Sequence, residues 1–132
     1  AESWQPINRP SRDAYILEAN RFYILLSKER LRVPPEFAAE MVVYDAGAGE
    51  IRTHYAGFFV PGFGWGDGSI LGTKVVMEVR AREVPFMVYD GQTSFKVWFE
   101  RLRSRPERVY GSDLGSSYQR QTLTLSKHFR RL

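Results

Sequence analysis

Glu78 is the residue whose surroundings most indicate chemistry, because it interrupts the apolar run VVMEV at residues 75–79. A carboxylate in an apolar strand costs free energy unless it is paired or hydrogen-bonded. In such surroundings it is also a stronger base than it is in water. Glu78 is therefore a candidate general base. The alternative is that its side chain points outward, or that it forms an ion pair with Arg80 or Arg82.

Other reactive side chains are few. The chain has no cysteine and two histidines, His54 and His128. This composition excludes disulfide scaffolds, thiol catalysis and cysteine-bound zinc, and it argues against a histidine-rich metal site. Ser116, Ser117 and His128 have the atoms of a hydrolase triad, but no G-x-S-x-G motif surrounds them.

Positive charge is concentrated at the C-terminus. The 132 residues carry 19 basic and 15 acidic groups, a net charge of +4. Residues 101–132 hold 8 basic and 2 acidic groups, so this segment is +6 and residues 1–100 are −2. Its glycines and serines would let it close over an anion such as a phosphate chain or nucleic acid. A solvated basic tail is the alternative. The last cations are Arg120, Lys127, Arg130 and Arg131.

Strand-like runs recur at intervals of roughly 8–12 residues, with turn residues between them, which is typical of an all-β sandwich or barrel. The expected strands cover residues 21–27, 41–44, 50–60, 73–81, 84–89 and 92–100. Proline suits the first turn of a helix, so Pro34 and Pro35 predict one short helix over residues 36–41. Asp90-Gly91 predicts a β-hairpin.

The chain length and two further segments indicate how the domain is organised. Residues 1–20 read as a lead-in or linker, and residues 21–132 as one domain with a closing tail from about residue 110. The loop PGFGWGDGSILG at residues 61–72 has five glycines but lacks the ending of a phosphate-binding P-loop. No apolar run approaches 18 residues, so no membrane-spanning helix is expected.

Four segments, in this order and spacing, together resemble dCTP deaminase. They are AGFFVPGFGW (56–65), VVMEVRAREVPF (75–86), DGQTSFKVWFERL (90–102) and YGSDLGSSYQRQTLTLSKHF (110–129). The resemblance is closest to the C-terminal half of the long, two-part bacterial form. It implies a dUTPase-like distorted β-barrel or jelly roll with at most one or two short helices. It also implies trimers, nucleotide at subunit interfaces, magnesium with the triphosphate, and no zinc.

The resemblance also implies roles for individual residues. Glu78 falls on the catalytic glutamate that activates water. The residues that fall on substrate contacts are Ala56, Gly57, Tyr110, Tyr118 and Gln121. The family's serine-containing motif is missing from residues 43–52, which read VYDAGAGEIR. Phe58, Val60 and Ser117 replace a basic residue, an acidic residue and a lysine, so we expect another half of the enzyme to complete the site.

Three functional readings follow. The first is a domain of a cytoplasmic dCTP deaminase that converts dCTP to dUTP and ammonia, and works in a homotrimer or pseudo-trimeric assembly. The second is a catalytically degenerate half that keeps the barrel and its packing. The third is a basic β-barrel that binds single-stranded nucleic acid. The third ranks last, because alternation predicts that Phe95, Val97 and Phe99 are buried rather than exposed for base stacking.

Overall fold

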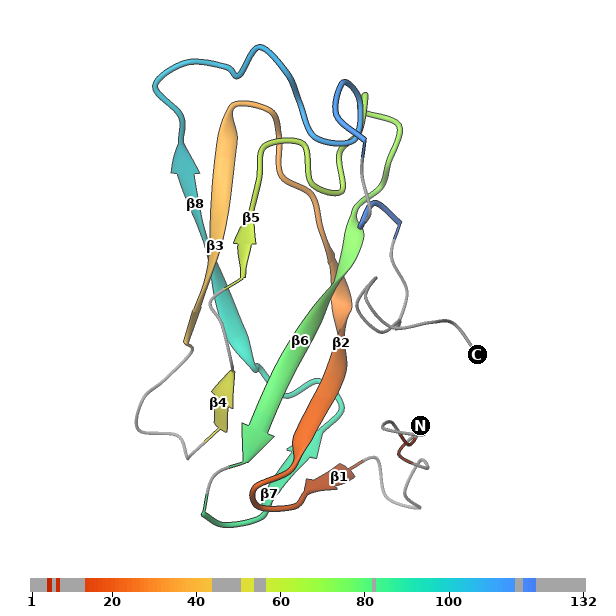
Figure 1. The fold of residues 1–132 in the computed structure, drawn as a ribbon, viewed down its shortest axis with the longest axis vertical. Coiled ribbons are helices and arrows are strands. Elements are labelled where there is room, and N and C mark those ends of the chain that lie inside the picture. The colour runs from red at the N-terminus through yellow and green to blue at the C-terminus, as the bar shows by residue number, and fades with distance from the viewer. Residues whose placement is uncertain are drawn as a thin grey trace.

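The residues that the computed structural model describes form eight strands arranged in three antiparallel sheets (Figure 1). The structure describes residues 5, 7, 14–43, 51–53, 57–81, 83–115 and 118–120. The strands are β1 (Ala14–Leu17), β2 (Phe22–Leu31), β3 (Phe37–Val43), β4 (Ile51–Thr53), β5 (Phe58–Phe59), β6 (Thr73–Ala81), β7 (Phe86–Tyr89) and β8 (Phe95–Arg101). The described residues contain no helix. The expectation of an all-β fold is therefore confirmed.

The first large sheet has the strand order β2-β6-β4, with β6 in the centre. β6 has the limits predicted for it, and its residues alternate between the two faces of the sheet. Thr73, Val75, Met77, Val79 and Ala81 are buried on the inner face. The β2 pairing shifts register between Leu26 and Arg30, which is the sign of a β-bulge.

The second large sheet has the order β5-β3-β8. Its central strand, β3, covers most of the segment predicted to be helical, so that prediction is wrong. The physical reason is a period of two: Ala39 and Met41 are buried on one face, whereas Glu40 between them is exposed. Pro34 and Pro35 are the first two residues of a turn rather than the start of a helix, and the turn is closed by the bond from Phe37 N to Pro34 O at 3.0 Å.

The third sheet joins β1 to β7, and Ala14 lies opposite Tyr89. This pairing corrects two expectations. Residues 14–17 belong to the folded domain rather than to a lead-in, since Leu17 is fully buried in the core. Asp90 and Gly91 do form a turn, but β7 and β8 pair with β1 and β3 and not with each other. A turn signal fixes the local reversal of the chain and not the partner of each strand.

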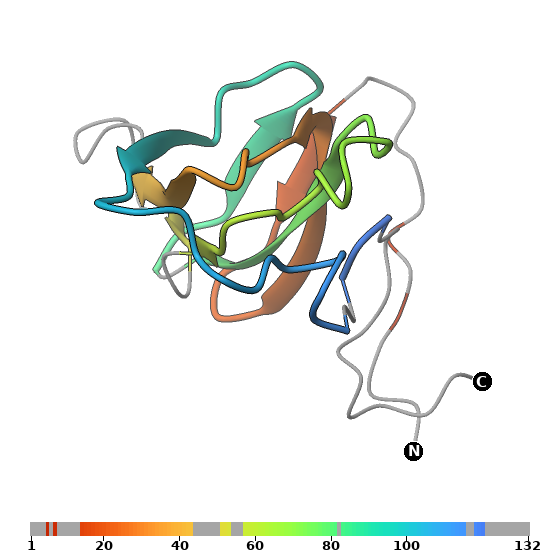
Figure 2. The same ribbon diagram turned by 90° about the horizontal axis from the view of Figure 1, so that it is seen from above.

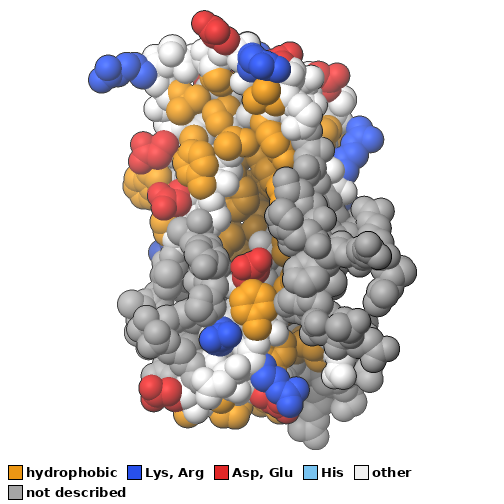
Figure 3. Space-filling view, viewed as in Figure 1, with side chains coloured by type: hydrophobic (Ala, Val, Ile, Leu, Met, Phe, Trp, Pro, Cys, Tyr) orange, Lys and Arg blue, Asp and Glu red, His pale blue; other side chains and the backbone are white. Residues whose placement is uncertain are grey.

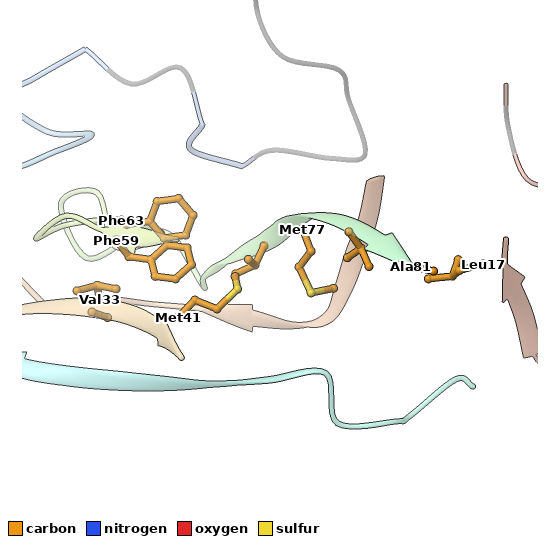
Figure 4. Packing of buried hydrophobic residues seen from close by; sticks show 10 residues of the cluster. Leu17, Val33, Met41, Phe59, Phe63, Met77 and Ala81 are labelled. Carbon is orange, nitrogen blue, oxygen red and sulfur yellow. The ribbon is translucent and has the colours of Figure 1, made fainter. Parts of the chain in front are cut away.

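The core lies between the two large sheets, which Figure 2 shows from above with β3 and β8 on one side and β2 and β6 on the other. Figure 4 shows how its side chains form a continuous row along the domain. Val33, Met41, Phe59 and Phe63 lie toward one end, Met77 in the middle, and Ala81 and Leu17 at the other end. Phe95 and Val97 pack against this core, whereas 43% of Phe99 is exposed, so burial was predicted correctly for only part of β8.

Candidate functional site

Glu78 lies on the outer face of the β2-β6-β4 sheet, directly opposite Ile24 of β2. Its side chain is exposed in the single chain, and it forms no ion pair with any residue that the structure describes. Glu78 therefore points outward, which was the alternative expectation, and its side chain is not buried as a general base in an apolar strand would be. β6 is the central strand of its sheet: Glu78 pairs with Ile24 of β2, and the pairing with β4 reaches the adjacent residue, Val79.

The face around Glu78 combines apolar side chains with the cation Arg80. The pairs that share the face with Ile24 and Glu78 are Leu26 with Val76 and Phe22 with Arg80. Ile24, Leu26 and Val76 are half-buried, and Phe22 is exposed. A carboxylate on a rigid strand between apolar side chains would lose its water if a second protein surface covered it. Figure 3 shows that hydrophobic side chains also reach the surface in the middle of the molecule, with charged groups nearby.

Tyr110 and Tyr118 lie together at the other end of β6. The Tyr110 ring stacks on Phe63, with ring centres 6.5 Å apart, and its backbone N–H donates to Pro61 O at 3.2 Å. The backbone N–H of Tyr118 donates to the Tyr110 hydroxyl at 3.2 Å. The two tyrosines that sequence analysis assigned to substrate contacts are therefore neighbours, one half-buried and one exposed.

Gly57 lies at the start of β5, where its carbonyl accepts a hydrogen bond from Met41 N at 2.8 Å. A Cβ at this position would stand 3.3 Å from the Phe59 ring, so a side chain would press on the core. Ala56 and Gln121, the other two predicted contacts, lie outside the described residues.

The tyrosines and Glu78 form two separate groups. Thr73, at the first position of β6, accepts a hydrogen bond from Arg120 N at 3.1 Å, which places the start of the C-terminal segment beside that strand end. Glu78 is five positions further along β6. At about 3.3 Å per residue, this is a separation of roughly 16 Å along the strand. The described residues of one chain thus do not bring all the predicted site residues to one point.

The glycine-rich loop at residues 61–72 is held by residues that sequence analysis did not single out. Gln119 places its amide against this loop, accepting from Gly64 N at 2.7 Å and donating to Gly62 O at 2.9 Å. Arg32 donates from Nη2 to Gly68 O at 2.6 Å. No local signal marks Gln119, because its partners lie more than fifty positions away in the sequence.

Asp67 stabilises the tip of the same loop. Its carboxylate accepts a hydrogen bond from Ser69 N at 3.0 Å. The side-chain and backbone hydrogen bonds of Ser69 hold the pKa of the Asp67 carboxyl below its usual value, and the positive charge of Arg120 acts in the same direction. The lowered pKa of Asp67 therefore reflects mainly the hydrogen bonds from Ser69 within the loop.

Two further findings concern metals and membranes. In the part of the chain that the structure describes, no three histidine or acidic side chains lie close enough to hold a metal ion. The same residues include no helix with the length and apolar character needed to cross a membrane.

The fold and site define an all-β domain of the dUTPase-like class. The family model "2'-deoxycytidine 5'-triphosphate deaminase (DCD), C-terminal domain" matches residues 1–129. The chain belongs to this family. It is also similar to a solved structure, 2'-deoxycytidine 5'-triphosphate deaminase from Agrobacterium tumefaciens, with 45% identity over 79% of this chain and a TM-score of 0.71.

The aligned region spans 31% of the length of the Agrobacterium protein. A search of curated proteins finds no match to the chain. The chain therefore corresponds to one domain of a longer protein of this family.

Proposed function

We propose that this chain is a domain of an enzyme that removes the amino group of the cytosine ring of dCTP, giving dUTP and ammonia. The observation that carries the proposal is the position of Glu78, a carboxylate on the central strand β6 that lies beside the apolar Ile24 and Val76 and forms no ion pair among the described residues. Family membership supports the same reaction, and the solved relative carries the name of a dCTP deaminase.

The proposed chemistry is hydrolytic. Glu78 takes a proton from water while the water oxygen forms a bond to C4 of the cytosine ring. That proton then passes to the amino nitrogen, the C4–N bond breaks, and ammonia leaves. The second water proton moves to ring N3 as the C4 hydroxyl becomes the carbonyl. Each atom is accounted for by water and dCTP, so the step needs no oxidant or reductant.

Magnesium would enter with the triphosphate as part of the substrate. Magnesium in nucleotide sites is commonly held by phosphates and water together with one or two carboxylates. The described residues do not gather a donor set for a resident ion, so we assign no step to a metal bound by this chain.

The rest of the site would come from a second protein surface. Glu78 is exposed in the single chain, and residues 43–52 lack the serine motif that the resemblance leads us to expect. A homotrimer or pseudo-trimeric assembly would supply that surface and would remove water from Glu78. We place such an assembly in the cytoplasm, with nucleotides rather than nucleic acid as its ligands.

A second candidate is a structural half that has lost turnover. The separation of about 16 Å along β6 between Glu78 and the Thr73 end, where Arg120 docks, favours it, because a complete site would need these groups near one substrate. In this case the outer face of the β2-β6-β4 sheet would serve only for packing against a partner.

The variant Glu78→Gln in the intact protein distinguishes the deaminase domain from the structural half. Glutamine keeps the shape but takes no proton from water, so turnover at sites containing Glu78 should fall by about 10²–10⁴-fold while dCTP binding is nearly unchanged. Glu83→Gln is the matched control, since Glu83 is exposed beyond the end of β6. Normal turnover by Glu78→Gln would favour the structural half.

A further inference from the structure

Strand β8 lies at the edge of its sheet. The sheet has the order β5-β3-β8, so β3 pairs with one side of β8, and among the described strands none pairs with its other side (Figure 1). Such an edge presents backbone N–H and C=O groups to which a further strand can bind. The long edge strand β2 is interrupted by a β-bulge, and β5 has only two residues, whereas β8 has seven in a regular register. β8 is therefore the edge best suited to extend a sheet.

The core is incompletely covered at this edge. Phe99 lies on the core-facing side of β8, the side that it shares with Phe95 and Val97. Its ring contacts Phe37 edge-on, with ring centres 6.4 Å apart, yet 43% of Phe99 is exposed. A strand added beside β8 would remove more of this apolar ring from water, which is favourable.

The outward side of β8 carries an exposed tryptophan. Trp98 is 61% exposed, and it lies in a row with Glu40 of β3 and Phe58 of β5, which are exposed as well. The Trp98 indole N–H donates to Glu100 Oε1 at 3.0 Å, so the ring is held in one orientation. Aromatic side chains, tryptophan above all, are enriched where protein surfaces meet. Figure 3 shows hydrophobic and acidic side chains next to one another on this side of the molecule.

The charges on β8 are self-complementary about Trp98. Lys96 lies two positions before Trp98 and Glu100 two positions after it, so all three side chains share the outward face. If two copies of β8 run antiparallel with Trp98 opposite Trp98, Lys96 of each copy lies opposite Glu100 of the other. A pairing centred on Lys96 or on Glu100 would instead set like charges opposite each other, which is unfavourable.

We infer that β8 pairs antiparallel with β8 of a second copy of this chain, around a two-fold axis at Trp98. The two three-stranded sheets then join into one sheet of six strands. In this register Val97 of each copy lies opposite Phe99 of the other, which covers the exposed ring. The contact is isologous, so both copies use the same surface. It involves a different sheet from the one that carries Glu78, and it does not depend on the proposed reaction.

The test reverses the two charges separately. In the intact protein, Lys96→Glu and Glu100→Lys each place like charges opposite each other twice in the paired strands. Glu29→Lys is the matched control, because Glu29 is an exposed residue of β2, in another sheet. The molecular mass is measured by analytical ultracentrifugation at increasing protein concentration. Seven-residue strands make a small interface, and small interfaces are weak, so a dependence on micromolar concentration is expected.

We expect the mass of the unmodified protein and of the control to rise about twofold with concentration. Each single variant should stay at the lower mass. An equal mixture of Lys96→Glu and Glu100→Lys should regain the higher mass, because both opposite-charge pairs are restored between unlike copies. This recovery also shows that both variants are folded. A mass that does not depend on concentration in the unmodified protein, or full association of both single variants, would overturn the pairing of β8. A mixture that stays at the lower mass would overturn the register centred on Trp98.

Discussion

Arg32 and Trp65 are stacked, with the guanidinium carbon of Arg32 3.9 Å from the centre of the indole ring. The same guanidinium donates a hydrogen bond to Gly68 O, so the Arg32 side chain contacts the glycine-rich loop at both Trp65 and Gly68. The Nε atom of Arg32 is buried and has no hydrogen-bond partner among the described residues. The stacking and the single strong hydrogen bond therefore have to compensate for that buried donor.

Replacing Arg32 by lysine should destabilise the domain although the charge is kept. Lysine has neither the planar group that stacks on Trp65 nor the fork that reaches Gly68 O. We expect a loss of about 1–3 kcal/mol in the free energy of unfolding, measured with urea. Arg103→Lys, at an exposed position, serves as the control. Equal stability of the two variants would show that the stacking is not energetically important.

A pair of adjacent substitutions tests whether β1 is part of the domain. Leu17 is fully buried, whereas Ile16 beside it is 59% exposed. Leu17→Ala should cost about 2–5 kcal/mol, the usual range for a large-to-small change in a core. Ile16→Ala should change stability by less than about 0.5 kcal/mol. Similar small effects for both would mean that β1 is dispensable, as expected of a linker.

The charge on Asp67 should make the loop sensitive to acid. The folded-state pKa of Asp67 is lowered by Ser69 and Arg120. Its contribution is therefore complete above the unfolded-state pKa of about 3.9 and is lost as pH falls through the lower folded value. Asp67→Asn keeps an acceptor for Ser69 N but does not titrate. The stability difference between the two proteins should shrink as pH drops from 6 to 3, and a constant difference would contradict this prediction.

Deleting residues 121–132 should separate anchoring from nucleotide binding. The cut leaves Gln119 and Arg120 in place, with their hydrogen bonds to the glycine-rich loop and to Thr73. It removes Gln121, Lys127, Arg130 and Arg131. We expect the intact protein to lose affinity for dCTP much more than for deoxycytidine, with the lost part weakening as salt rises. Equal loss for nucleotide and nucleoside would argue that the segment does not contact phosphates.

The success of sequence analysis depended on whether a feature is local. The alternation of apolar and polar residues along β6 is a local feature. It places Val75, Met77 and Val79 on one face of the strand and Glu78 on the other. Since the apolar face packs on the core, this alternation alone predicts that Glu78 points outward. A strand was expected at residues 41–44, but the first part of β3 was taken for a helix, because alanines weaken the alternation and the two prolines favoured a helix start. The role of Gln119 depends on a loop distant in sequence, and no local pattern records such a contact.

The pairing of β1 with β7 has a consequence for synthesis of the chain on the ribosome. Ala14 lies opposite Tyr89, 75 positions later. At about 5–20 residues per second, the first strand waits roughly 4 to 15 s before its partner has been made. During this interval the hydrogen-bonding edge of β1 that faces β7 has no native partner strand in the nascent chain. Completion of the barrel is therefore a late event, and crowding between neighbouring nascent chains would be most harmful before residue 89 emerges.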